Sequence, residues 1–273
     1  MKERISVTLN HDLIKEVDKT VDGVSIPNRS FAIEKLLRER LKPRSHRVAI
    51  ILAGGEGTRL RPLTYEMPKP MIPIKGKPIL EYIINRLKLA DVSEVIITTG
   101  YKGDRVKEYF GNGEKFGLLI RYLDEKTPLG TGGAVKSAEN LLHDDFFVIN
   151  GDNLFDFNLN EIYEFHKREK AIVTIGLTNQ EDVSKFGVVE LDGTKVTKFI
   201  EKPKVKPKSH LINTGIHVIS PLFFGFMPEG NFNLSKLLEK AAEKGMVSGF
   251  VYSGKWLPCD SMELYEKALK NWP

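Results

Sequence analysis

The stretch LAGGEGTRLRPLTYEMPKPMIPIKGKPI, from Leu52 to Ile79, follows directly on the apolar run 48–51. A short continuous apolar run is typical of a strand that is buried on both faces of a parallel sheet. Three glycines within 54–57 then allow a tight turn and a close approach of backbone N–H groups to an anion. The stretch therefore predicts a phosphate-binding loop at the end of a central strand.

Cationic side chains follow this turn. Arg59 and Arg61 carry planar, permanently charged guanidinium groups that suit phosphate oxygens. Lys69 lies between two prolines, which leave its backbone few conformers and so aim its ammonium group. The two common glycine fingerprints do not fit, because no Gly-Lys-Ser/Thr ends the turn and Leu60 stands where the dinucleotide motif needs Gly or Ala. An ordinary turn between a strand and a helix, with surface charge nearby, is the alternative.

Strand and helix patterns alternate on the C-terminal side of residue 47. Strand patterns run over 48–53, 94–100, 118–125 and 146–151, and helix patterns over 78–90, 104–110 and 132–142. The alternation predicts an α/β domain over 47–273, with a Rossmann-like, mostly parallel sheet and helices on both faces. The segments 187–193 and 195–203 alternate in hydropathy about Asp192-Gly193, which predicts an inserted β-rich region built on a hairpin.

The composition of the 273-residue chain, with 41% hydrophobic and 28% charged residues, is that of a globular protein. No apolar run reaches membrane-spanning length, so no membrane contact is expected. The single cysteine excludes an internal disulfide framework and predicts a reducing, cytoplasmic environment. The six histidines show no zinc-ligand spacing.

Most of the net charge of +5 lies at the N-terminus. Residues 1–47 hold 11 Lys and Arg against 7 Asp and Glu, whereas the rest of the chain holds 30 against 29. Residues 4–9 alternate polar and apolar like a half-buried strand, and two amphipathic helices are predicted over 11–21 and 29–41, the first capped by Asn10. A strand and two helices make too small a core to be stable alone, so residues 1–43 are predicted to form a separate module that dimerises.

This N-terminal pattern resembles the ribbon-helix-helix DNA-binding fold, in which two chains pair their strands into a ribbon that enters the major groove. The resemblance implies that Ile5, Val7 and Leu9 face inward. It implies DNA contacts from Arg4, Ser6, Thr8, Asn28, Arg29 and Ser30. A module that only dimerises, with its basic residues solvated, is the alternative.

Asp152 follows the buried run 146–149 and a glycine, at the end of a predicted strand where ligands of α/β sheets bind. A carboxylate there is a common Mg²⁺ ligand, because Mg²⁺ takes few protein carboxylates and completes its shell with phosphates and water. A turn or helix-capping aspartate is the alternative. The glycine turn 130–133 opens a helix and predicts either a second nucleotide-binding loop or a simple N-cap.

The run AGGEGTRLRPLTYEMPKPMIPIKGKPILEYII resembles the signature of the sugar-1-phosphate nucleotidyltransferases, or NDP-sugar pyrophosphorylases. The resemblance continues through TTGYKGD, PLGTGGAVKSA, NGDNLF, FGVVE, FIEKP and INTGIHVIS. It implies an Mg²⁺-dependent enzyme that joins a nucleoside triphosphate (NTP) to a sugar 1-phosphate and releases pyrophosphate. The PLGTGGA segment is most similar to mannose-1-phosphate guanylyltransferases and glucose-1-phosphate thymidylyl- or uridylyltransferases.

The resemblance also implies roles for individual residues. Arg59 and Lys69 would neutralise the triphosphate during catalysis, and Lys202 the sugar phosphate. Nucleotide contacts are expected from Leu52, Ala53, Gly54, Gly55, Gly57, Thr58, Arg59, Lys69, Glu125, Gly130 and Thr131. Sugar-phosphate contacts are expected from Gly187, Glu201, Lys202, Asn213, Thr214 and Gly215. From these residues alone, without the rest of the family pattern, Glu201-Lys202 would be interpreted as a solvated charge pair before a loop.

The C-terminal motif departs from the family pattern Trp-x-Asp-x-Gly-Thr, whose Asp is the second metal-binding carboxylate. Pro258 takes the place of that Asp, and Asp260 takes the place of the Gly. Asp260 is therefore either a second metal ligand beside Asp152 or the N-cap of a last helix over 261–269. One hypothesis is an active enzyme that also represses its own operon or a related sugar-pathway operon. The alternative is a DNA-binding regulator with a catalytically degenerate sugar-nucleotide-sensing domain.

Overall fold

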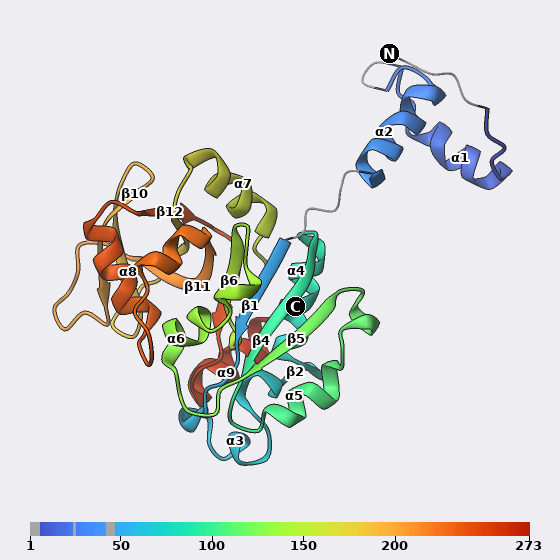
Figure 1. Ribbon diagram of the computed structural model, residues 1–273. Coiled ribbons are helices and arrows are strands. Elements are labelled where there is room, and N and C mark those ends of the chain that lie inside the picture. Colours follow the sequence, from blue (N-terminus) through green and yellow to red (C-terminus); the bar gives the residue numbers. More distant parts are fainter. Residues whose placement is uncertain (1–5, 24–25, 42–46) are drawn as a thin grey trace. The chain divides into compact units, whose positions relative to one another are not determined.

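The computed structural model describes residues 6–23, 26–41 and 47–273 (Figure 1). Backbone contacts divide the chain into two units, residues 1–45 and residues 46–273. Each unit is described by itself. Among the described residues, no helix combines the length and the apolar character needed to cross a bilayer.

The N-terminal unit contains the two expected helices, α1 (His11–Lys19) and α2 (Arg29–Leu41). The Asn10 side chain caps α1, because its Oδ1 accepts a hydrogen bond from the Asp12 N–H at 2.9 Å. Asn28 rather than Ser30 caps α2, through a 2.9 Å bond from the Phe31 N–H to Asn28 Oδ1. Helix α1 ends two residues before the predicted boundary at 21.

The predicted N-terminal strand is absent from its described part, residues 6–9. Val7, which was expected to face inward, is 64% exposed. A strand needs a hydrogen-bonded neighbour, and the described residues of this unit form no strand that could pair with it. Leu9 is partly buried, whereas Arg4 and Ile5 lie outside the described residues.

The C-terminal unit contains a nine-stranded sheet with the order β5-β4-β1-β6-β11-β8-β12-β10-β9. Its strands are β1 (Arg47–Leu52), β4 (Val92–Thr99), β5 (Leu119–Asp124), β6 (Phe146–Asn150), β8 (Val173–Asn179), β9 (Gly187–Asp192), β10 (Lys195–Glu201), β11 (Leu211–Ile219) and β12 (Val247–Val251). The sheet is mostly parallel, because only β10 and β11 run against the other seven strands. The predicted hairpin forms β9 and β10, which extend this sheet.

Helices cover both faces of the sheet, as the alternation predicts (Figure 1). Side chains on β1 alternate: Ala49 and Ile51 pack into one core, and Val48 and Ile50 into the other. The first core is covered by α4 (Ile79–Leu89), α5 (Gly103–Phe110), α7 (Leu159–Glu169) and α9 (Met262–Asn271). The second is covered by α6 (Gly130–Lys136) and α8 (Leu234–Glu243).

Two small sheets and one short helix lie around the ends of these strands. β7 (Asn153–Phe155) pairs with β13 (Trp256–Pro258), and β2 (Pro73–Ile74) pairs with β3 (Lys77–Pro78), while α3 spans Leu63–Glu66. The helix predicted over 132–142 is divided into α6 and a 3-10 turn. The Ser137 hydroxyl at the break donates to the Ala134 carbonyl, a bond that competes with helix geometry.

The carboxyl ends of the parallel strands are joined by backbone hydrogen bonds. The Ala53 N–H donates to the Thr98 carbonyl, the Gly151 N–H to the Leu52 carbonyl, and the Glu125 N–H to the Thr99 carbonyl, at 2.8–3.1 Å. Residues that follow β1, β5 and β6 are thereby held beside the end of β4, at one edge of the sheet.

Candidate active site

Two neighbouring cavities open at this edge of the sheet. The first has a volume of about 590 Å³ and the second about 440 Å³. The residues that line both cavities are Arg59, Thr131, Asn150, Asp152 and Asp260. One cation and two carboxylates thus stand where the cavities meet, which is the place where groups bound in each could react.

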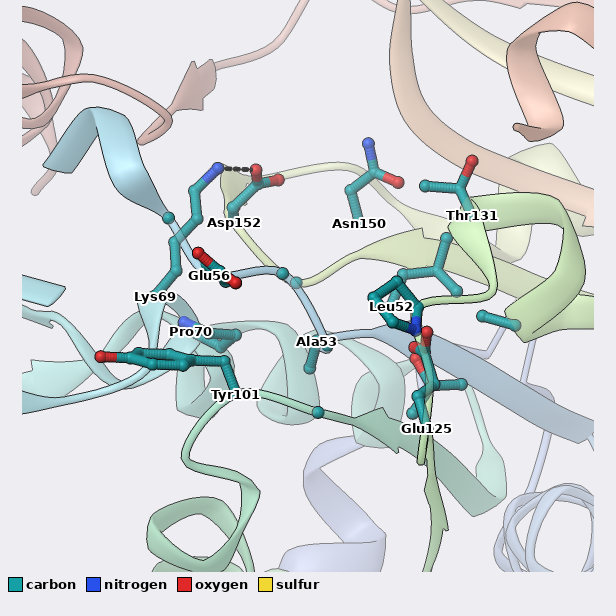
Figure 2. A pocket seen from close by; sticks show the side chains of 18 of the residues that line it. Leu52, Ala53, Glu56, Lys69, Pro70, Tyr101, Glu125, Thr131, Asn150 and Asp152 are labelled. Atoms are coloured by element: carbon teal, nitrogen blue, oxygen red, sulfur yellow. Dashed lines mark hydrogen bonds and ion pairs between the residues drawn. The ribbon is translucent and has the colours of Figure 1, made fainter. Parts of the chain in front are cut away.

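The first cavity lies over the loop between β1 and α3 (Figure 2). All eleven residues predicted to contact a nucleotide line it: Leu52, Ala53, Gly54, Gly55, Gly57, Thr58, Arg59, Lys69, Glu125, Gly130 and Thr131. Arg61, the other arginine of the loop, is half-exposed beside Glu56 and does not line either cavity.

Gly54 gives room to the side chain opposite it. A Cβ at this position would lie 2.5 Å from Oε1 of Glu125, so a larger residue would displace that carboxylate. The other oxygen, Oε2, accepts a 3.1 Å hydrogen bond from the Leu129 N–H. Among the described residues, no lysine or arginine pairs with Glu125. The first cavity therefore holds an oriented carboxylate without a cationic partner.

The second glycine turn has a packing role that the sequence did not reveal. Cβ atoms at Gly132 and Gly133 would lie 2.2 Å from the Phe232 ring and 2.4 Å from the Gly230 carbonyl oxygen. Thr131 does not cap its own helix: its Oγ1 accepts from the Leu234 N–H at the start of α8, at 2.9 Å. The glycines therefore allow the segment 230–232 to pack against α6, and the N-cap alternative is wrong.

Two ion pairs link the predicted phosphate-binding cations to the predicted metal ligands. The Lys69 ammonium contacts the Asp152 carboxylate (Figure 2). The Arg59 guanidinium lies 2.8 Å from Asp260 Oδ2. Without substrate, each cation is neutralised by a carboxylate of the same site.

Pairing of β7 with β13 explains why Asp152 and Asp260 are neighbours. Pro258 pairs with Asn153, and the Cys259 N–H donates to the Asp152 carbonyl at 2.9 Å. Asp152, which precedes β7, and Asp260, which follows β13, therefore lie at the same end of this small sheet. Ser261 caps α9, since its Oγ accepts from the Leu264 N–H. Asp260 is therefore not the helix cap that was considered as an alternative.

The donor set suits Mg²⁺. Asp152 and Asp260 supply carboxylate oxygens at the junction of the cavities. No group of three or more His, Cys, Asp or Glu side chains forms a metal site among the described residues. Mg²⁺ does not need such a cage, because one or two carboxylates plus substrate phosphates and water complete its shell.

The second cavity gathers all six residues predicted to contact the sugar phosphate: Gly187, Glu201, Lys202, Asn213, Thr214 and Gly215. They come from β9, the end of β10 and β11. Burial raises the pKa of the Glu201 carboxyl above its ordinary value, although Lys202 nearby opposes this effect. A half-buried carboxylate of this kind can accept hydrogen bonds from hydroxyl groups.

Several lining residues were missed by the sequence analysis. Gly100 and Tyr101 line the first cavity, Lys185 and His217 line the second, and Asn150 lines both. Gly100, Asn150 and His217 lie inside motifs that were recognised, TTGYKGD, NGDNLF and INTGIHVIS, so their place in a motif was a usable signal. Lys185 stands just before the motif FGVVE and carried no such signal, because its placement depends on long-range packing.

Cys259 lines neither cavity and is fully buried, and burial raises the pKa of its thiol to about 12. This environment suits a structural role, because a buried neutral thiol is inert.

The residues expected to contact DNA lie in different surroundings. Ser6, Thr8 and Ser30 are exposed, and Asn28 is engaged in capping α2. Arg29 donates two 2.7 Å hydrogen bonds to Asp18, so its guanidinium is already paired. Arg4 lies outside the described residues.

Comparison with known proteins agrees with the resemblance for the C-terminal unit. The family model described as nucleotidyl transferase matches residues 48–269 and leaves out the N-terminal unit. The bifunctional protein GlmU of Methanococcus maripaludis is 38% identical over 216 residues, which cover 76% of this chain and 50% of that protein. The chain thus spans about half the length of that relative.

Two further relatives match over nearly their whole length. D-glycero-alpha-D-manno-heptose 1-phosphate guanylyltransferase of Campylobacter jejuni is 34% identical over 224 residues, which cover 82% of this chain and 99% of that enzyme. The structure of HddC from Yersinia pseudotuberculosis in complex with GMP-PN has a TM-score of 0.71 at 27% identity, and covers 83% of this chain and 100% of that one. With its two cavities and its family match over 48–269, the chain belongs to the nucleotidyl transferase family.

Proposed function

We propose that this protein transfers a nucleotidyl group from an NTP to a sugar 1-phosphate and releases pyrophosphate. The observation that supports this most is the junction of the two cavities at Arg59, Asp152 and Asp260. A glycine-rich loop suited to phosphates lines one cavity, and polar side chains suited to hydroxyl groups line the other. Two anionic substrates would meet at charged side chains of both signs.

The chain's part in the reaction is to hold two anions together. A phosphate oxygen of the sugar 1-phosphate attacks the α-phosphorus of the NTP, and pyrophosphate leaves. This oxygen is already anionic, so no protein base is needed. Lys69 and Arg59 exchange their carboxylate partners for the triphosphate, and Lys202 holds the sugar phosphate. Positioning and charge stabilisation account for the rate.

Mg²⁺, when bound, would be held by Asp152 and Asp260 and would neutralise charge on the phosphates. Asp260 then takes the place of the family's usual second carboxylate, which Pro258 replaces. On this interpretation, the chain is an active enzyme and not a degenerate sensor.

Glu125 favours GTP as the nucleotide. Its carboxylate has no cationic partner among the described residues and would repel a triphosphate, so it suits the base end of the first cavity. Ionised carboxylates only accept hydrogen bonds. Guanine presents N1–H and N2–H donors side by side, whereas uracil and thymine present one N–H between two carbonyl acceptors. A carboxylate therefore pairs with guanine through two bonds.

The substitution Glu125→Gln is expected to lower the ratio of kcat/KM for GTP to that for UTP by at least about fivefold, because a bidentate contact to a base contributes about 1–3 kcal/mol of discrimination. The amide replaces one acceptor by a donor, which suits the uracil O4. Steady-state pyrophosphate release measures the ratio. Glu56→Gln is the control, since Glu56 lines the same cavity but is exposed near Arg61. An unchanged ratio in E125Q would contradict the role of Glu125.

The reaction itself is tested with five NTPs against mannose, glucose, N-acetylglucosamine and heptose 1-phosphates. The expected result is pyrophosphate release that requires both substrates and Mg²⁺, with GTP the best nucleotide. A preference for UTP or dTTP would support the proposed reaction but would contradict recognition of guanine by Glu125. Absence of pyrophosphate from every pair would instead favour the degenerate sensor.

For residues 1–43 we propose a dimerisation module that binds DNA as a dimer. Among the side chains described in this unit, five large apolar ones are exposed: Val7, Leu13, Phe31, Leu36 and Leu37. Burying them between two copies would remove apolar surface from water. The basic excess of this segment suits a polyanionic partner.

Light scattering of the full chain is expected to report a dimer, and Phe31→Asp a smaller species. A gel shift with DNA from upstream of the protein's own operon is expected to weaken steeply with salt. A dimer that does not bind DNA would leave dimerisation as the role of this module. A monomeric full chain would contradict both dimerisation and DNA binding as a dimer.

A further inference from the structure

His217 is a buried histidine on β11, at the wall of the second cavity. The proposed reaction gives this histidine no role. It is 2% exposed, and burial lowers the pKa of its imidazole to about 4. The ring is therefore neutral at physiological pH and carries its single N–H on one of its two nitrogens.

An irregularity of β11 brings His217 to Asn213. In a regular strand, residues four apart lie about 13 Å from each other. Here Nε2 of His217 lies 3.1 Å from Oδ1 of Asn213. The register of β11 against β8 shifts between these two residues, and Gly215 between them has φ +74°. A Cβ at Gly215 would lie 2.4 Å from the Asn150 side chain, so this backbone needs glycine. Bulges of this kind re-aim side chains beside binding sites.

The hydrogen bonds at Asn213 determine which histidine nitrogen carries the proton. The Gly215 N–H donates to the same Asn213 oxygen at 2.9 Å, and a backbone N–H can only donate. The contact of His217 with that oxygen must therefore be made by an Nε2–H donor. Two donors hold the Asn213 oxygen, and its amino group, which has no partner among the described residues, is left for the second cavity.

The bulge is also tied to the small sheet that carries the two aspartates. The Thr214 carbonyl accepts from Nδ2 of Asn153 and from Nε1 of Trp256, both at 2.9 Å. Asn153 and Trp256 lie on β7 and β13. The position of the Asn213 amide is thereby fixed relative to Asp152.

We propose that His217 is a positioning residue for the sugar: its Nε2–H holds the Asn213 carboxamide so that the amino group donates to a hydroxyl oxygen of the sugar 1-phosphate. This inference rests on the proposed function. It predicts that the sugar 1-phosphate must carry a neutral hydroxyl at the position that meets Asn213. A sugar 1-phosphate that lacks this hydroxyl should therefore bind more weakly.

The test compares His217→Leu, His217→Gln, Asn213→Ala and the double variant N213A/H217L in the full chain. H217L and N213A are each expected to raise KM for the sugar 1-phosphate about tenfold, the effect of one lost hydrogen bond in a closed site. The KM for the NTP should change less than twofold. H217Q should recover most of the wild-type KM, because the glutamine amide can supply the same N–H, and the double variant should be no worse than N213A.

His166→Leu is the matched control. His166 is equally buried, on α7, and bonds to Thr174 rather than to a cavity residue. It should lower thermal stability without changing KM for the sugar. An unchanged sugar KM in H217L, or effects of N213A and H217L that multiply in the double variant, would overturn the proposal. If H217L does not fold, a sugar KM in H217Q as high as in N213A would overturn it. Failure of the wild-type chain to consume any sugar 1-phosphate would contradict the proposed function instead.

Discussion

Replacing Asp152 by asparagine is expected to lower kcat for pyrophosphate release by about 10²–10³-fold, the effect of losing one preorganised electrostatic contact to the reacting phosphates. Asp152 lines both cavities and forms an ion pair with Lys69. The asparagine keeps the shape of the side chain but removes the charge that would hold Mg²⁺ at the junction. Steady-state rates over a range of Mg²⁺ concentrations measure the loss and any increase in the metal requirement.

Asp144→Asn is the control for this substitution. Asp144 is exposed and precedes β6, whereas Asp152 follows it, so the two aspartates flank opposite ends of one strand. D144N should keep the wild-type rate and metal dependence. If D152N retained more than a tenth of the wild-type kcat at the same Mg²⁺ concentration, Asp152 would not be the metal-binding carboxylate.

Lys69→Met is expected to lower kcat/KM for the NTP by about 10²-fold or more, because one cation aimed at developing phosphate charge supplies roughly 3–4 kcal/mol in a closed site. The Lys69 side chain is 14% exposed and is the cation nearest Asp152 in the first cavity. Removing it also leaves Asp152 without its partner, which should tighten Mg²⁺ binding to the free enzyme. Rates and calorimetric Mg²⁺ titration measure the two effects.

The matched control is Lys75→Met. Lys75 belongs to the same proline-rich loop but is exposed and lines neither cavity. A loss in K75M as large as that in K69M would mean that the net charge of the loop, and not the aimed ammonium group, supports catalysis. Lys69→Arg should recover little, because a guanidinium fork does not replace a compact ammonium group at a fixed point.

Local signals explain how much of the fold could be predicted. Apolar runs such as 48–51 became β1, and the amphipathic run 78–90 became α4, because burial of their apolar faces agrees with their own propensity. The first-cavity loop was predictable for the same reason, since its glycines and cations are contiguous in sequence. The strand predicted over 4–9 is absent from its described residues 6–9 in the single chain, because strand pairing depends on a partner that the pattern does not contain.

The parts of the site that sequence did not reveal depend on contacts between distant segments. Gly132 belongs to the turn that was predicted to be either a nucleotide-binding loop or an N-cap, but it packs against Phe232, a hundred residues later. Only the structure distinguishes Asp260 from a helix cap, because it shows that Ser261 caps α9 and that β13 pairs with β7. His217 meets Asn213 only because β11 bulges at Gly215, and nothing in the alternation of that strand predicts the bulge.

The central claim is that the α-phosphate of the nucleotide becomes joined to a sugar phosphate. GTP labelled at the α-phosphorus, and separately at the γ-phosphorus, can be incubated with the full chain, Mg²⁺ and a sugar 1-phosphate. The account predicts that the α-label appears in a GDP-sugar and the γ-label in pyrophosphate, in equal amounts and only when both substrates are present. Release of the γ-label as inorganic phosphate, or its transfer to the sugar, would contradict it.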